Sequence, residues 1–165
     1  MDKRVVITGL GAITPIGKNV EENWNSIKEK KCGIDEITLF NTENFKTKLA
    51  AEVKEYNPLE HFEAKQAKRL DRYSQFAIIA AREAVKSSEI SKENTDFNRV
   101  GIFVSSGIGG LRTIQEQCDV NFEKGNKRIS PMFIPMSIAN MPSGNIAIEF
   151  GFKGESMSIL TCLLY

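Results

Sequence analysis

A run of β-branched and aromatic residues that ends in glycines constrains the fold of this chain most. Residues 100–105 have the sequence VGIFVS, and three glycines follow within residues 106–110. Such a short apolar run predicts a buried strand, and the glycines predict a loop that another segment approaches closely. Residues 5–8, VVIT, precede the glycine-rich segment 9–17 in the same way. We therefore expect two central strands, each followed by a loop.

Helical patterns separate these strands. Asn19 can cap a helix that carries Val20, Trp24 and Ile27 on one face. The longest helical pattern covers residues 67–88 and places one set of side chains on a single face: Tyr73, Phe76, Ala77, Ala80 and Ala84. Further segments complete the prediction: helices over 113–122 and 137–150, and strands over 48–53 and 156–161. Strands that alternate with helices predict a mainly parallel α/β sheet.

Composition excludes several classes of protein. The 165 residues correspond to one domain or part of a larger one, and the net charge of +1 argues against a dedicated nucleic-acid-binding protein. No apolar run approaches the roughly 18–20 residues of a membrane-spanning helix, so we expect no membrane partner. The cysteines Cys32, Cys118 and Cys162 form no C-x-x-C motif. We expect reduced thiols in the cytoplasm, and no metal or tightly bound cofactor.

Two familiar catalytic patterns are incomplete in this chain. The segment GLGAIT at residues 9–14 follows a predicted strand, but Thr14 stands where a dinucleotide-binding fingerprint needs its third glycine. His61 is the only histidine, and no G-x-S-x-G motif accompanies it. A sharp structural loop at 9–17 and a non-catalytic histidine are the favoured interpretations.

Basic residues gather in two clusters. Lys65, Lys68 and Arg69 lie on one face at helical spacing, and Lys127 and Arg128 belong to the second cluster. A solvated helix face is the common outcome for such a charge run. The alternative is a small binding site for an acidic partner.

The last residues offer a candidate nucleophile. Cys162 follows a predicted buried strand, and a thiol at a strand-to-helix turn would have its thiolate stabilised by the helix. Here LLY follows, with no small residue for a tight turn, so a buried structural thiol is favoured on the residues alone. The end of the chain is apolar throughout residues 159–165, and we expect a missing continuation. The alternative is a short terminal strand that docks on the core.

Four segments in this order resemble the β-ketoacyl-[acyl-carrier-protein] synthases. They are VVITGLG with TPIG at residues 5–17, DRYSQF at 71–76, SSGIGG at 105–110 and FIPMSIANM at 133–141. The resemblance covers residues 1 to about 161 and is greatest to the elongating enzyme of type II bacterial fatty acid synthesis. Each motif alone is moderately specific, and the four together are highly specific.

The resemblance implies a thiolase-like α/β fold. In this family two similar halves form a five-layered αβαβα sandwich and dimerise, so residues 1–165 would form an incomplete first half, truncated at the active-site strand. The implied reaction is a decarboxylating Claisen condensation. A cysteine takes the acyl chain as a thioester, and the carbanion left by decarboxylation of malonyl-carrier protein attacks it. Two histidines and a lysine from the second half would assist this reaction.

The family pattern around the nucleophile is not matched. Alignment of Ser158 and Thr161 with the family's Ser-x-x-Thr-Ala-Cys places Leu163 at the nucleophile position and Cys162 where the family has alanine. A shift of one residue along a strand reverses the side-chain direction, so we do not expect Cys162 to substitute. We expect no intact catalytic set and no activity of this chain alone, and a shift of reading frame after Thr161 would explain the pattern.

Other positions match the family's binding residues. The resemblance assigns the two basic clusters to an acidic acyl carrier protein: Lys65, Lys68, Arg69, Lys127 and Arg128. It assigns Ile108 to the acyl pocket and Phe133 to a segment at the dimer interface, although both are also suited to a core. Two other hypotheses remain open. One is a non-catalytic ketosynthase-like partner of the chain-length-factor type, and the other is a free-standing carrier-binding module.

Overall fold

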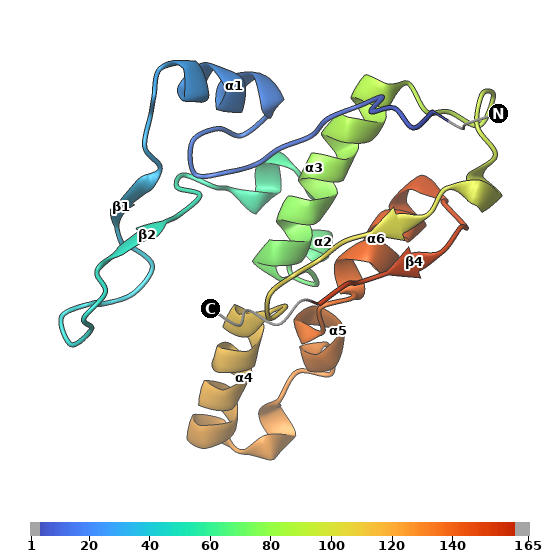
Figure 1. Cartoon of the computed structure of the whole chain (residues 1–165). Helices are drawn as coiled ribbons and strands as arrows, with labels where there is room; N and C mark the ends of the chain where they lie inside the picture. Colours follow the sequence, from blue (N-terminus) through green and yellow to red (C-terminus); the bar gives the residue numbers. More distant parts are fainter. Residues whose placement is uncertain (1–3, 161–165) are drawn as a thin grey trace. The chain divides into compact units, whose positions relative to one another are not determined.

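The computed structural model describes residues 4–160. The chain divides into two compact units, Met1–Asn57 with Ile79–Glu89 and Pro58–Ile78 with Ile90–Tyr165. Helix α3 (Arg72–Ser88) contributes its first part to the second unit and the remainder to the first (Figure 1). Within the described range, no helix has the length and apolar character needed to cross a membrane.

The first unit contains an extended N-terminal segment, a helix and a hairpin. Helix α1 (Val20–Lys28) is followed by strands β1 (Ile34–Glu36) and β2 (Leu49–Ala51), which pair antiparallel with Asp35 opposite Ala50. Strand β2 lies inside the strand predicted over residues 48–53. Strand β1 was not predicted, because its IDE sequence has a single apolar residue.

The strand predicted over residues 5–8 does not form. Val5, Val6 and Ile7 are 96%, 60% and 84% exposed, and neither sheet among residues 4–160 includes them. The glycines that follow lie against α3 instead. A Cβ on Gly11 would meet the Ala80 carbonyl oxygen at 1.8 Å, so only glycine permits this close approach.

Helix α1 begins as predicted but buries a different face. The Asn19 side chain accepts a hydrogen bond from the Glu22 amide at 2.8 Å and caps the helix. Trp24 and Ile27 are exposed, whereas Asn23 and Ser26 are buried. The buried polar side chains satisfy loop carbonyls: the Asn23 amide donates to the Gly17 oxygen at 3.0 Å and the Ser26 hydroxyl donates to the Ile16 oxygen at 2.6 Å.

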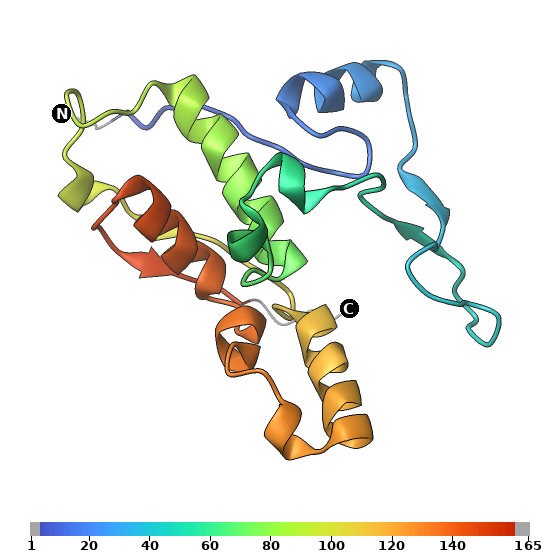
Figure 2. The same ribbon diagram turned by 180° about the vertical axis from the view of Figure 1, so that it is seen from behind.

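The second unit contains a parallel pair of short strands with helices around them. Its elements in chain order, besides the start of α3, are η1 (Pro58–Glu60), α2 (Ala64–Ala67), η2 (Phe97–Arg99), β3 (Ile102–Phe103), α4 (Leu111–Lys124), η3 (Asn126–Arg128), α5 (Phe133–Ser137), α6 (Met141–Phe150) and β4 (Ser156–Met157). Strands β3 and β4 pair in parallel, with Ile102 opposite Ser156. Helix α6 contacts both strands (Figure 2). The predicted parallel α/β arrangement is therefore confirmed for this pair.

The helix predicted over residues 67–88 forms as α3, but it starts later than predicted and is preceded by a separate short helix. Helix α2 ends at Ala67 and α3 begins at Arg72. The Gln75 side-chain amide donates to the carbonyl oxygens of Ala67 and Leu70, at 3.1 and 2.9 Å, and so closes the break. The buried face of α3 also differs from the prediction, because its buried residues are Ser74, Gln75, Ile78 and Ile79.

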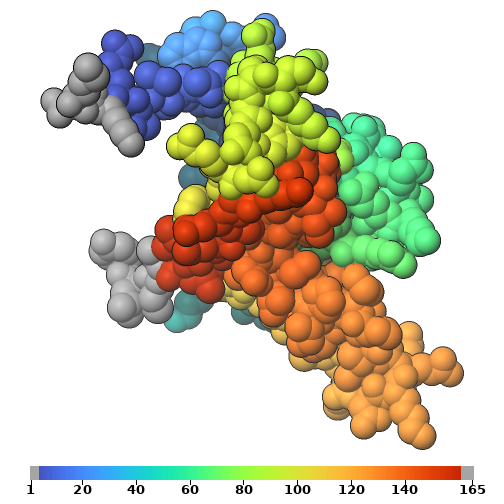
Figure 3. Space-filling view, turned by 90° about the vertical axis from the view of Figure 1, so that its right-hand side faces the viewer, coloured from blue at the N-terminus to red at the C-terminus, as the bar shows by residue number. Residues whose placement is uncertain are grey.

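The core of the second unit joins α3, β3 and α6. Its buried apolar side chains are Phe62, Ile78, Ile102, Ile146 and Phe152. The Phe152 ring packs edge-on against Phe97 at 4.9 Å and stacks on Phe150 at 5.4 Å between ring centroids. In the space-filling view, the orange to red atoms of α5, α6 and β4 form one continuous surface (Figure 3).

Candidate functional site: a glycine loop and a groove of mixed charge

The loop that follows β3 is held against the end of α5. The Gly110 amide donates to the Ser137 carbonyl oxygen at 2.9 Å, and the Gly109 amide donates to the Ser106 hydroxyl at 2.9 Å. Gly109 has φ +88°, and a Cβ there would lie 2.4 Å from the Ser137 oxygen. Glycine is required at this position for both backbone conformation and space. The close approach expected from the SSGIGG sequence is therefore confirmed.

The carboxylate of Asp71 accepts hydrogen bonds from residues of two helices, α3 and α4. One oxygen, Oδ1, accepts the Tyr73 amide of α3 at 3.3 Å. The other, Oδ2, accepts the Thr113 amide and hydroxyl of α4 at 3.1 and 2.5 Å. Asp71 is 6% exposed and Thr113 is 4% exposed, so these hydrogen bonds are shielded from water.

Tyr73 fixes the turn between α5 and α6. Its hydroxyl donates to the Ile138 carbonyl oxygen at 2.5 Å. Burial raises the pKa of the Tyr73 phenol above its ordinary value, and the negative charge of Asp71 acts in the same direction. The phenol therefore stays protonated as a hydrogen-bond donor through the neutral pH range.

A groove of about 640 Å³ lies on the second unit and is lined by apolar and charged side chains. Lys65 and Arg69 line it beside Glu63 and Glu149. Its apolar lining comes from α3, α5, α6 and the residues next to them: Leu70, Ile78, Met132, Pro135, Met141 and Ile148. Two of these lining residues are methionines, whose flexible side chains suit contacts with a partner of variable shape.

The structure unites only some of the predicted carrier-binding residues. Lys65 and Arg69 line the groove, whereas Lys68 is exposed outside the lining. Lys127 and Arg128 are exposed on η3, which packs on α4. The described structure therefore shows two separate basic clusters, as the sequence does.

The predicted acyl-pocket and interface residues lie in the glycine loop and in α5, respectively. Ile108 is in the glycine loop and is 61% exposed, and Phe133 is the first residue of α5 and is half-buried. Cys162 and Leu163 lie outside the described residues. Among residues 4–160, no group of three or more His, Cys, Asp or Glu side chains is arranged to hold a metal ion.

Sequence analysis did not single out Asp71 and Thr113 as site residues. Asp71 was placed inside a continuous helix, which hid its position immediately before the first turn of α3. An aspartate before a helical pattern is a start signal, and it was available in the sequence. The contact with Thr113 spans 42 residues of sequence, and no local pattern indicates it.

Comparison with known proteins shows the family of this chain. The family model described as "Beta-ketoacyl synthase, N-terminal domain" matches residues 2–162. This chain belongs to the beta-ketoacyl synthase family. The thiolase-like α/β class expected from the resemblance is confirmed, and the chain corresponds to a partial fold of this type.

Two curated relatives of this chain carry the same name. This chain is 41% identical over 160 residues to the 3-oxoacyl-[acyl-carrier-protein] synthase 2 of Staphylococcus aureus. The match covers 97% of this chain and 39% of that protein. The chain is 38% identical over 159 residues to the enzyme of the same name from Synechocystis sp., covering 96% and 38%. The chain therefore spans about two fifths of the length of these relatives.

Solved ketosynthase structures share the arrangement. The ishigamide ketosynthase/chain length factor superposes with a TM-score of 0.82 at 27% identity, covering 94% of this chain and 39% of that chain. A type II polyketide synthase complex of a ketosynthase, AntDE, with its acyl-carrier protein, AntF, superposes with a TM-score of 0.75 at 23% identity, covering 96% and 41%. The second likeness concerns the fold alone.

Proposed function

We propose that this chain provides the N-terminal part of a 3-oxoacyl-[acyl-carrier-protein] synthase that elongates fatty acids. The observation that carries this proposal is the 41% identity to 3-oxoacyl-[acyl-carrier-protein] synthase 2 over 97% of the chain. In the reaction proposed for the complete synthase, a cysteine thiolate of the enzyme displaces the carrier thiol from an acyl thioester. Malonyl-carrier protein then loses carbon dioxide, its carbanion forms the new carbon–carbon bond, and the cysteine thiolate leaves.

The proposed part played by this chain is recognition. Lys65 and Arg69 line the groove together with apolar side chains, so cations that attract an acidic protein lie beside contact area, although Glu63 and Glu149 line it too. Lys68, Lys127 and Arg128 are further exposed cations of the second unit. We assign all five to an acidic acyl carrier protein, Ile108 to the acyl pocket and Phe133 to a homodimer interface.

At the position that aligns with the family nucleophile, this chain has no cysteine. Leu163 occupies the position that aligns with the family cysteine, and Cys162 is one residue early. We therefore propose that the chain binds carrier protein without accepting an acyl group.

A cytoplasmic location accompanies this proposal. Cys32 and Cys118 are free thiols and both are exposed. Exposed thiols remain reduced in a cytoplasmic environment, where glutathione and thioredoxin act on them.

Charge reversal tests the carrier-binding surface. The double variant Lys65→Glu/Arg69→Glu should weaken binding of an acidic acyl carrier protein at least about tenfold at low salt, because attraction becomes repulsion at both positions. Titration calorimetry or fluorescence anisotropy would measure the dissociation constant. Lys28→Glu is the matched control, since this exposed lysine of α1 lies outside both clusters. Equal affinities of the wild type and the double variant would refute the assignment.

A second function is supported by one solved structure. The ishigamide protein, which is similar to this chain at a TM-score of 0.82, is described as a ketosynthase/chain length factor. Leu163 would suit a non-catalytic partner of that type, which lacks the acyl-accepting cysteine. Such a partner should co-purify with a complete synthase, whereas a carrier-binding module alone should not.

A further inference from the structure

One buried carboxylate stands out among the residues that the structure describes. Asp71 is the only Asp, Glu, Lys, Arg or His residue among residues 4–160 that is buried. A buried carboxylate is costly unless its oxygens accept hydrogen bonds. Three donors meet this requirement, the Tyr73 amide on Oδ1 and the Thr113 amide and hydroxyl on Oδ2.

Asp71 accepts a hydrogen bond from an amide at the start of α4, which the N-cap residue of that helix cannot accept. Gly110 occupies the N-cap position of α4 and has no side chain to accept the first free amides. No larger residue fits there, because a Cβ would lie 2.6 Å from the Met136 oxygen and 2.9 Å from Asp71 Oδ2. The carboxylate supplies the missing acceptor from a distant part of the sequence, and its charge suits a helix N-terminus.

The glycine loop is therefore held from two sides. On one side, Asp71 holds Thr113 and lies directly against Gly110. On the other side, the Ser137 carbonyl accepts the Gly110 amide. We call these contacts of Asp71 and Ser137 the loop clamp. Ile108 lies in the sequence between β3 and the clamped residues Gly110 and Thr113, and it is 61% exposed. With little packing around its side chain, the position of Ile108 depends on the backbone that carries it.

We infer that Asp71 is a positioning residue for Ile108, acting through Thr113 and Gly110. The inference rests on the proposed function for the role of Ile108 in the acyl pocket. A loop released from Asp71 would let Ile108 occupy several positions, and the pocket would lose its selection among acyl chains.

Substitutions on both sides of the contact test this inference. Asp71→Asn keeps the shape, but its single oxygen cannot accept on both sides and its amide nitrogen can only donate. Thr113→Val removes the hydroxyl donor alone, and Thr113→Ser restores it. Asp96→Asn is the matched control, because Asp96 also caps a helix, by accepting the Asn98 amide at 3.0 Å, but in η2.

Two measurements on the purified chain report the outcome. Hydrogen exchange follows the amides of residues 106–113, and methyl NMR follows the Ile108 δ1 signal. We expect exchange at Thr113 to become about tenfold faster in Asp71→Asn, with a shifted or broadened Ile108 signal. Thr113→Val should show a smaller effect of the same kind, and Thr113→Ser and Asp96→Asn should match the wild type at both reporters.

An unchanged Ile108 signal in Thr113→Val and Asp71→Asn would overturn the inference. So would an equal increase in exchange across the whole second unit, because that pattern indicates general destabilisation. If Asp71→Asn does not fold, Thr113→Val decides alone. Neither measurement requires catalysis or carrier protein, so a failure here leaves the proposed function intact, and a failure of carrier binding leaves the loop clamp intact.

Discussion

At the scale of single residues, Gly109 carries two constraints that can be separated by experiment. Its φ of +88° is unfavourable for any side chain, and its Cβ would lie 2.4 Å from the Ser137 oxygen. Gly125 has a similar φ of +80° with no atom within 4 Å of its Cβ. The second glycine therefore measures the backbone cost alone.

We expect Gly125→Ala to lower the free energy of unfolding by about 1–3 kcal/mol, the usual cost of a strained backbone conformation. Gly109→Ala should cost roughly a further 1–3 kcal/mol, because the α5 backbone must move away from the new methyl group. Urea unfolding of both variants would measure the difference. Equal costs would show that the loop tolerates the methyl group, which would contradict the close packing of the loop on α5.

Sequence patterns predicted residues with local roles better than residues with distant partners. Asn19 was identified as a cap, because the capped amide lies three residues away. The basic residues of the groove were identified as a cluster by their helical spacing, and the resemblance then assigned that cluster to an acyl carrier protein. Asp71 was not found, since its partner Thr113 is distant in the sequence.

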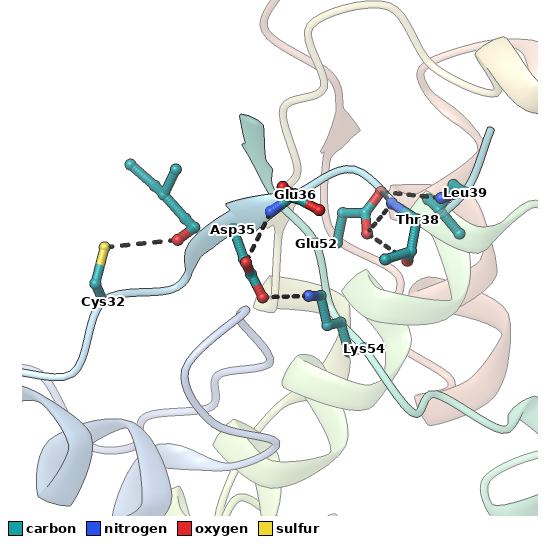
Figure 4. A network of polar contacts seen from close by, with 8 residues as sticks. Cys32, Asp35, Glu36, Thr38, Leu39, Glu52 and Lys54 are labelled. Atoms are coloured by element: carbon teal, nitrogen blue, oxygen red, sulfur yellow. Dashed lines mark hydrogen bonds and ion pairs between the residues drawn. The ribbon is translucent and has the colours of Figure 1, made fainter. Parts of the chain in front are cut away.

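At the scale of elements, the β1–β2 hairpin depends on exposed charged groups (Figure 4). Asp35 accepts a hydrogen bond from the Lys54 ammonium at 2.6 Å, and this contact lowers the pKa of Asp35 and raises the pKa of Lys54. The hydroxyl of Thr38 donates to Glu52 at 2.8 Å and lowers the pKa of that carboxyl. These groups are exposed, so salt and solvent weaken each contact.

The hairpin should consequently loosen at both ends of the pH scale. The carboxylates stabilise the folded hairpin above their ordinary pKa values of 3.8 and 4.5, and this contribution is lost as pH falls through their lower folded values. The Lys54 contribution is present below 10.5 and is lost as pH rises through its higher folded pKa. NMR titration of the Thr38 amide should show the acid step, and Glu52→Gln should remove it. An unaltered Thr38 titration in Glu52→Gln would refute this account.

The elements of the second unit were predicted more completely than those of the first. The run at residues 100–105 contains β3, which has a parallel partner in β4. The run at residues 5–8 is also rich in β-branched residues, yet it has no neighbouring strand among the described residues. An apolar run indicates a preference for burial, whereas a strand also needs a partner to accept and donate its backbone hydrogen bonds.

At the scale of the whole molecule, apolar surface remains uncovered on both units. Trp24 and Val5 are exposed on the first unit, and Phe122, at 94%, and Ile148, at 81%, are exposed on the second. Side chains of this size are suited to contacts with other proteins where they gather in one patch. They agree with a proposed role in which the chain works together with further protein surfaces, including a carrier protein.

Native mass spectrometry of the chain with an acyl-loaded acidic carrier protein tests the central claim most directly. The Cys32→Ser/Cys118→Ser background removes the exposed thiols found among residues 4–160, which could exchange with the thioester. The account predicts a non-covalent complex at low salt, in which the chain itself gains no acyl mass. An acyl adduct on Cys162, or no complex with carrier protein, would contradict the account.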